Sequence, residues 1–391
     1  MRHSPAHWSP LAMLIIAWAA VWPAGSPVDA SQYRYAEDAH GQPARVTESW
    51  DIQGTEWQGI GTINSLVRCG DEAFLADSQS RVRRYDLKHR KPLDDIGVAD
   101  DEGRLARPAV LAADCAAQLL YVVDGGLRAV LSYRLPSGTF HKKYPLPRTF
   151  VLGGSAELVD PGLLYVGGLW FPFQQGPQWS LNALDFDHFF DPLRFGVNVP
   201  LESGDVTPGF HGYEDKCVSA SSCIKVNLAR VKGGGPIAWA IAQAGSEHVG
   251  LYAGDGKHLA SIDVRSPAFR RSGVSAGPNT PARQYILWRR ENSEIDRVFA
   301  FGKIIATSHL VADVEPDWDF GPMNYRVHMN LHSLDGTGLV SDISLPGRPV
   351  GRDESHIYVV DYSRGGRPPE AKSVRLLRIP IKVGKGGFQR N

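Results

Sequence analysis

Five arginines recur along the chain, each beside a short run of β-forming residues. They are Arg107, Arg148, Arg230, Arg297 and Arg348. A guanidinium group binds a carboxylate or a phosphate through two parallel hydrogen bonds. If the five positions are equivalent in the fold, their side chains surround one opening and form a site for an anion, such as a uronate, an acidic peptide end or a partner's carboxylates. The alternative is a structural role, in which they pair with Asp77, Asp124 or Asp361.

Aromatic residues gather in two further segments, 168–179 and 308–323. Trp170 and Trp179 stand in the first segment and Trp318 in the second. Exposed aromatic rings offer a stacking surface to a sugar or to an apolar partner. The alternative is that both groups pack down as a lid. We therefore treat the three tryptophans as candidate ligand-binding residues.

Sequence motifs of metalloproteases and of phosphate-binding loops are absent from the chain. His328 and His332 are four residues apart, but four residues of a β-strand span about 13 Å. Two histidines at that distance cannot bind one metal ion alone. We expect them to be surface or packing residues.

The elements that would position these residues are short strands that repeat. Segment 74–87 (FLADSQSRVRRYDL) returns at 120–135 (LYVVDGGLRAVLSYRL), with looser copies near 164, 240, 304 and 357. A period of roughly 45 residues with several strands is typical of a β-propeller blade. We predict an all-β, six-bladed β-propeller of four-stranded antiparallel blades. Seven blades is the alternative, because about 75 residues separate the second strands of blades three and four.

The chain ends before the sixth blade is complete. We predict that a strand within residues 45–52 supplies the missing strand and closes the ring, which removes an open sheet edge. Long insertions follow the second strand of a blade at 168–179, 308–323 and 363–372, and another, 190–224, joins two blades. In antiparallel blades all four leave the same face. We therefore predict one loop-rich face, where binding residues usually lie.

The first residues have the pattern of an export signal. The apolar run 11–22 is too short to span a bilayer, and small residues precede Ser31. We predict a signal peptide at 1–30 cleaved near Ala30, a lead-in at 31–44, the propeller at 45–382, a flexible tail at 383–391, and a secreted or periplasmic location. Lys and Arg together number 42, as do Asp and Glu, so bulk charge attracts neither nucleic acid nor membrane. We expect a monomer.

Four cysteines in an exported chain predict two disulfides. Cys217 and Cys223 would close a local loop. Cys69 and Cys115 occupy similar places in the first two repeats, so neighbouring blades could bring them together. Two buried free thiols are the alternative for this second pair.

The runs at 74–87, 120–135 and 357–361 (IYVVD) resemble six-bladed propellers of the NHL and TolB-like type. The resemblance implies a ring with a central channel and no single activity, since relatives include binding modules, lactonases, lyases and hydrolases. More distant gluconolactonase-like relatives hold a metal with Glu, Asn and Asp around the channel. Comparable places here carry Asn64, Glu157, Asn227 and Asp353, although that family's Glu-Gly-Pro opening is missing. Such oxygen ligands suit Ca²⁺ or Mg²⁺; polar turn residues are the alternative.

These patterns predict an exported protein that binds a small or acidic ligand, or a protein partner, on its loop-rich face without a cofactor. The alternative is a hydrolase or lyase that acts on a sugar acid or lactone at the channel mouth, with Ca²⁺ or Mg²⁺.

Overall fold

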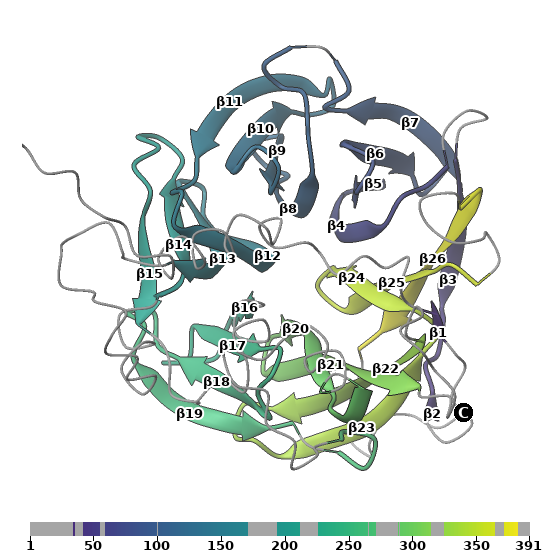
Figure 1. The fold of residues 1–391 in the computed structure, drawn as a ribbon, viewed down its shortest axis with the longest axis vertical. Coiled ribbons are helices and arrows are strands. Elements are labelled where there is room, and N and C mark those ends of the chain that lie inside the picture. The colour runs from purple at the N-terminus through teal and green to yellow at the C-terminus, as the bar shows by residue number, and fades with distance from the viewer. Residues whose placement is uncertain are drawn as a thin grey trace, which may run out of the picture.

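Short strands rich in β-branched and aromatic residues form a ring of antiparallel sheets (Figure 1). We call the space between the inner strands of the ring the channel. The computed structural model describes residues 34–35, 42–54, 59–99, 101–170, 194–211, 226–264, 266–270, 288, 290–313, 324–363 and 371–381. The all-β propeller architecture is confirmed. No helix in these ranges has the length and apolar character needed to cross a bilayer.

Three of the sheets are four-stranded meanders that run from the channel to the rim. The first contains β8 (Pro108–Asp114), β9 (Leu119–Asp124), β10 (Ala129–Arg134) and β11 (Thr139–Pro145). The second contains β12 (Phe150–Asp160), β13 (Leu163–Trp170), β14 (Arg194–Pro200) and β15 (Thr207–His211). The third contains β16 (Val226–Arg230), β17 (Trp239–Gln243), β18 (His248–Tyr252) and β19 (His258–Asp263).

The other two sheets are larger because they include segments from the N-terminal part of the chain. One contains β20 (Glu294–Phe301), β21 (Ile304–Asp313), β22 (Asn324–Ser333) and β23 (Gly338–Leu345), with β1 (Arg34–Tyr35) and β2 (Gln42–Pro43) added in parallel. The other joins two meanders through one parallel bridge between β24 and β4. Its members are β4 (Ile63–Cys69), β5 (Glu72–Asp77), β6 (Arg81–Asp86), β7 (Lys91–Ile96), β24 (Arg348–Arg352), β25 (His356–Asp361), β26 (Ser373–Pro380) and β3 (Glu48–Gln53).

Strand β3 completes the last meander, as predicted from the sequence. It pairs antiparallel with β26, from Ser373 opposite Gln53 to Arg378 opposite Glu48. Trp50 of β3 is buried, and its indole N–H donates to the carbonyl of Leu87 at 3.0 Å. An early segment therefore closes the ring on its latest strand. The number of blades stays a prediction, because residues 171–193 and 212–225 lie outside the described part of the chain.

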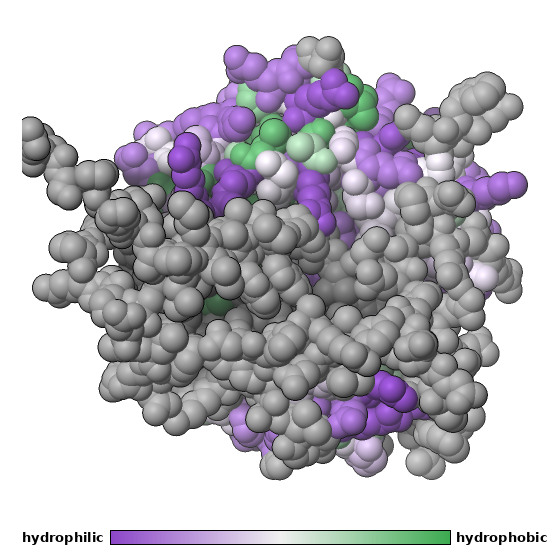
Figure 2. All heavy atoms as spheres, viewed as in Figure 1, coloured by the Kyte–Doolittle hydropathy of each residue, from purple (hydrophilic) through white to green (hydrophobic). Residues whose placement is uncertain are grey.

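The core lies between neighbouring blades rather than in one central cluster. Second strands such as β9 and β17 are almost fully buried, because blades cover both of their faces. Outer strands such as β11 alternate between exposed and buried positions, because one of their faces meets water. In Figure 2 the described surface is mostly hydrophilic, with a small hydrophobic group near the top. The exposed large hydrophobic residues in the described ranges are Val46, Val98 and Leu259.

Irregular pairing marks the innermost strands. The register with the second strand shifts by one residue after Ile63 in β4, Pro108 in β8, Ile295 in β20 and Pro349 in β24. Such a bulge rotates the following side chains. The extra residues include Asn64 and Asp296, which are therefore re-aimed near the channel.

The antiparallel meanders define two faces. We call the face where the inner strands begin the loop-rich face, and the opposite one the hairpin face. Segments 171–193, 212–225, 314–323 and 364–370 connect strand ends that lie on the loop-rich face. This connectivity agrees with the prediction of one loop-rich face, and the segments themselves lie outside the described residues.

We predict that Trp50→Ala destabilises the protein strongly, because it removes a buried ring and one hydrogen bond from the closing strand. The expected loss in the free energy of unfolding is about 3–5 kcal/mol. Chemical denaturation followed by tryptophan fluorescence measures it. Val46→Ala is the matched control, since Val46 is exposed and precedes the same strand. Equal stability of the two variants would contradict the closing role of β3.

Candidate functional site

The side chain of Arg297 crosses the central channel. It leaves β20, and its Nη2 donates to the carbonyl of Asn64 on β4 at 2.6 Å, while Nη1 donates to the carbonyl of Gly154 on β12. Neither β4 nor β12 neighbours β20 in the ring (Figure 1), so both contacts span the channel. Arg297 is buried. The guanidinium fork, with five N–H donors in a fixed plane, suits this bridging role.

Two asparagines lie at the level of this bridge with their carboxamides unsatisfied. Asn64 and Asn227 are each 1% exposed, and neither the amide nitrogen nor the amide oxygen of either one forms a hydrogen bond with another described residue. A Cβ atom at Gly154 would collide with Asn227 Oδ1 and Arg297 Nη1, so glycine permits this close approach. Buried polar groups are nearly always paired, and an unpaired one costs about 1–3 kcal/mol. The channel therefore holds four polar atoms that a small ligand or water could satisfy.

A buried ion pair lies beside these groups. Arg348, at the start of β24, donates through Nε and Nη2 to Asp296 of β20 at 3.0 and 2.8 Å, and both side chains are almost fully buried. A bidentate pair of this kind fixes the geometry of both partners. Arg348 thus has an acidic partner, but one that the sequence did not suggest.

The remaining predicted arginines lie at different levels of the fold. Arg107 precedes β8, Arg148 is exposed in a loop, and Arg230 ends β16. The five arginines therefore do not occupy equivalent positions around one mouth, and that premise was wrong. The suggested aspartate partners have other contacts: Asp77 pairs with Arg83 and Asp361 with Arg375.

Asp124 shows why such aspartates recur in the repeats. Its carboxylate accepts hydrogen bonds from the backbone N–H groups of Ala106, Arg107, Gly126 and Leu127. It therefore links the segment that precedes β8 to the turn that follows β9. This is a structural role in the turn.

Glu157 lies nearer the hairpin face, where it pairs across the channel. Arg352, at the end of β24, places Nη2 3.4 Å from Glu157 Oε1 on β12. Both side chains are about one-fifth exposed, at 22% and 23%. Arg352 also lies over the ring of Phe301, 5.9 Å from its centroid. A second arginine therefore crosses the channel at its hairpin end.

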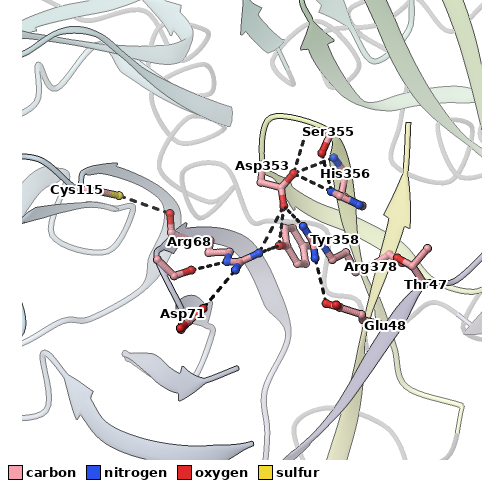
Figure 3. A network of polar contacts seen from close by, with 11 residues as sticks. Thr47, Glu48, Arg68, Asp71, Cys115, Asp353, Ser355, His356, Tyr358 and Arg378 are labelled. Atoms are coloured by element: carbon pink, nitrogen blue, oxygen red, sulfur yellow. Dashed lines mark hydrogen bonds and ion pairs between the residues drawn. The ribbon is translucent and has the colours of Figure 1, made fainter. Parts of the chain in front are cut away.

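Asp353 belongs to a polar network at the seam between the first and last meanders (Figure 3). One oxygen accepts from the N–H groups of Ser355 and His356, and the other accepts from Tyr358 and pairs with Arg378 at 3.1 Å. Burial raises the pKa of Asp353, but the hydrogen bonds from Ser355, Tyr358 and His356 outweigh it and lower the pKa to about 2. Asp353 therefore stabilises the ring seam.

The four proposed metal ligands are placed in different surroundings. Asn64 and Asn227 lie at the level of Arg297, Glu157 pairs with Arg352, and both oxygens of Asp353 are engaged. No group of three or more His, Cys, Asp or Glu in the described part of the chain could hold a metal ion. The residues present do not fit the predicted Ca²⁺ or Mg²⁺ site as one cluster.

The disulfide between Cys69 and Cys115 is confirmed and joins the ends of β4 and β8, with Cα atoms 5.4 Å apart. Cys217 and Cys223 lie outside the described residues, as do Trp179 and Trp318. Trp170 is half-buried, and its indole N–H donates to Thr149 Oγ1 at 2.9 Å. Its ring packs between the β8–β11 and β12–β15 blades. Trp170 therefore supports the interface between these blades.

His328 and His332 are packing residues, not surface residues. Both project from β22 and are buried. The ring of His328 stacks on that of His309, its partner on β21, with centroids 5.5 Å apart. Within the described part of the chain, neither ring nitrogen of His332 has a hydrogen-bond partner. Burial lowers the pKa of His332, and the nearby charge of Asp263 opposes this only in part.

The residues that sequence reasoning missed are Asp296, Arg352 and Gly154. Arg352 follows Arg348 by four residues in the run GRPVGR, and this spacing was an available signal. The roles of Asp296 and Gly154 depend on strands distant in sequence, for which the chain carries no local signal.

No protein-family model matches this chain, and no curated protein matches its sequence. Two solved structures from Bacteroides share its fold, and a third resembles it more distantly. A DUF4221 family member from Bacteroides vulgatus has a TM-score of 0.63 at 9% identity, covering 88% of this chain and 99% of that chain. A candidate exported protein from Bacteroides fragilis has a TM-score of 0.51 at 10% identity, covering 90% and 99%. The WD40 repeats of RRP9 have a TM-score of 0.49 at 12% identity, covering 88% and 100%.

At these identities the likeness establishes the fold alone. The sequence resemblance to NHL and TolB-like proteins holds at the level of a propeller fold, and the finer type stays a prediction.

We predict that the free energy of unfolding falls as the pH is lowered from about 6.5, because His332 must take up a proton in a buried site. A depressed histidine pKa means that the unfolded chain binds the proton first, so this stability is complete above pH 6.5 and is lost below it. His332→Leu should flatten the curve of stability against pH between 6.5 and 5. His141→Leu, at an exposed position, is the control and should leave the curve unchanged.

We predict that Asp353 adds stability above about pH 4 that is lost as the pH falls through about 2. In the folded protein the pKa of Asp353 is lower than in the unfolded chain. On acidification the unfolded chain therefore takes up the proton first, which favours unfolding. Asp353→Asn should remove on the order of 2 kcal/mol at neutral pH and reduce the dependence on pH between 4 and 2. Thermal unfolding across that range measures both effects. Asp160→Asn, at the exposed last residue of β12, is the control; a similar loss in both variants would contradict the role of the network.

Proposed function

We propose that this chain is an exported β-propeller that binds a small polar ligand in its central channel, approached from the loop-rich face. The observation that carries the proposal is the pair of buried, unsatisfied carboxamides of Asn64 and Asn227 beside the Arg297 bridge. Two amides provide both N–H donors and carbonyl acceptors, so a ligand with hydroxyl, amide or carboxylate groups can satisfy them. An unsatisfied buried polar group lowers the stability of the folded protein. Such groups are expected mainly at functional sites, where a ligand can satisfy them.

The surroundings favour binding over covalent chemistry. Asp296 is held by a bidentate pair with Arg348, and Asp353 is held by Arg378 and by hydrogen bonds. A general acid or base must exchange protons with a substrate, and a carboxylate held in an ion pair is poorly suited to this. No observation among the described residues favours the hydrolase or lyase alternative.

Export is supported by the N-terminal sequence pattern and by the structural likeness to a candidate exported protein of Bacteroides fragilis. We assign the chain to the periplasm or the outside of the cell, where the Cys69–Cys115 disulfide would persist. The six-fold ring with a cleaved signal peptide at 1–30 is part of this proposal.

We predict that a panel of monosaccharides, uronates, amino acids and dicarboxylates contains a ligand that stabilises the wild-type protein against heat. Asn64→Ala and Asn227→Ala should each lose that stabilisation. Without ligand, both variants should unfold at the same or a higher temperature than wild type, because each loses an unpaired buried amide worth about 1–3 kcal/mol.

Asn198→Ala is the matched control, because Asn198 lies on β14 and donates to the carbonyl of Pro208. It should keep the ligand effect. The proposal would be overturned by a high-resolution crystal structure in which water alone satisfies both amides, together with no binding across the panel.

A further inference from the structure

The hairpin end of the channel carries a second group of charges that the channel site does not use. We call it the hairpin-mouth cluster; its members are Glu157, Arg230, Lys232, Lys303 and Arg352. Arg230 ends β16, Lys303 lies in the turn between β20 and β21, and Arg352 ends β24. Three neighbouring inner strands thus place their basic residues at one mouth.

The cluster has more positive than negative charge. Arg230 contacts the carbonyl of Leu158 at 3.4 Å, and Arg352 contacts the adjacent residue Glu157, so both guanidinium groups reach consecutive residues of β12. Arg230 makes no ion pair, and Lys232 and Lys303 are exposed and unpaired within the described ranges. Among these described residues Arg352 is the one that pairs with Glu157, so the cluster as defined has four basic groups and one carboxylate.

The contact of Glu157 with Arg352 is of a kind that an external anion can replace. It is a single contact at 3.4 Å between side chains that water reaches. Partly exposed pairs of this type contribute little to stability. Asp353, the carboxylate that directly follows β24, is already held by Arg378 and by hydrogen bonds. Glu157 thus occupies the position beside Arg352 that the carboxylate of a ligand would take.

We propose that the hairpin-mouth cluster is a binding site for the carboxylates of a small organic acid. One carboxylate pairs with Arg230, and a second competes with Glu157 for Arg352, whose flat guanidinium is supported by the ring of Phe301. Lys232 and Lys303 add attraction at the rim. This site is separate from the amides of Asn64 and Asn227 and does not depend on a ligand there.

Calorimetric titration of the full chain with citrate, at an ionic strength held constant with sodium chloride, tests the proposal. Citrate stabilises many proteins by exclusion from their surface, so a binding isotherm is a better readout than a melting temperature. Saturable binding is expected for wild type. Arg230→Gln and Arg352→Gln should weaken it at least tenfold, whereas Arg148→Gln, on a loop at the other face, should bind as wild type.

Glu157→Gln provides the sharpest arm of the experiment, because it removes the competing carboxylate and should tighten citrate binding by about two- to fivefold. A gain in affinity cannot result from misfolding. Absence of saturable binding in both wild type and Glu157→Gln would overturn the proposal. Wild-type affinity in Arg230→Gln, or weaker binding in Glu157→Gln, would do the same.

Discussion

The bridge from Arg297 to the carbonyls of Asn64 and Gly154 is the contact on which the organisation of the channel depends. It joins β20 to two strands, β4 and β12, that are not its neighbours in the ring. It therefore holds inner strands from different sides of the ring at a fixed distance. A charged hydrogen bond in a site shielded from water is stronger than a neutral one. The guanidinium therefore ties strands on different sides of the ring together at the level of Asn64 and Asn227.

The polar groups at the Arg297 level differ from those at the hairpin end. On the Arg297 level, Asn64 and Asn227 keep uncharged amides with unused hydrogen-bonding capacity. At the hairpin end, Arg352 and Glu157 are charged and in partial contact with water. Burying an unpaired charge costs far more than burying an unpaired amide. At the Arg297 level the charges of Asp296 and Arg348 are therefore paired with each other, whereas the pair of Arg352 and Glu157 at the mouth is in contact with water.

Much of the architecture could be predicted from the sequence, because its signals are local. Apolar runs that end in Asp or Gly mark the second strands and their turns, and the shortage of residues after β26 indicated that β3 must close the ring. The Cys69–Cys115 pair followed from equivalent places in adjacent repeats. The parallel additions β1 and β2 had no such signal, because two-residue pairings carry no pattern.

The candidate site was harder to predict for a physical reason. The bulges in β4 and β20 redirect Asn64 and Asp296, and a one-residue shift in register cannot be read from composition. The sequence showed that the five arginines stand beside similar apolar runs. Their heights along the channel, however, depend on the residue at which each inner strand begins. Both arginines precede apolar runs in the sequence. In the structure, however, the side chain of Arg297 lies in the channel, whereas Arg148 lies in an exposed loop.

The pairing of β3 with β26 has a consequence for biosynthesis. Thr47 and Arg378, which meet beside this pairing, are 331 positions apart in the chain. A ribosome releases the first of these long before the second, so the toroid cannot be completed co-translationally, and loop closure of this length slows assembly. Until then β3 lacks its antiparallel partner β26, and an unpaired strand edge is a site for chaperone capture or aggregation. A nascent chain truncated shortly before β26 would keep that strand open.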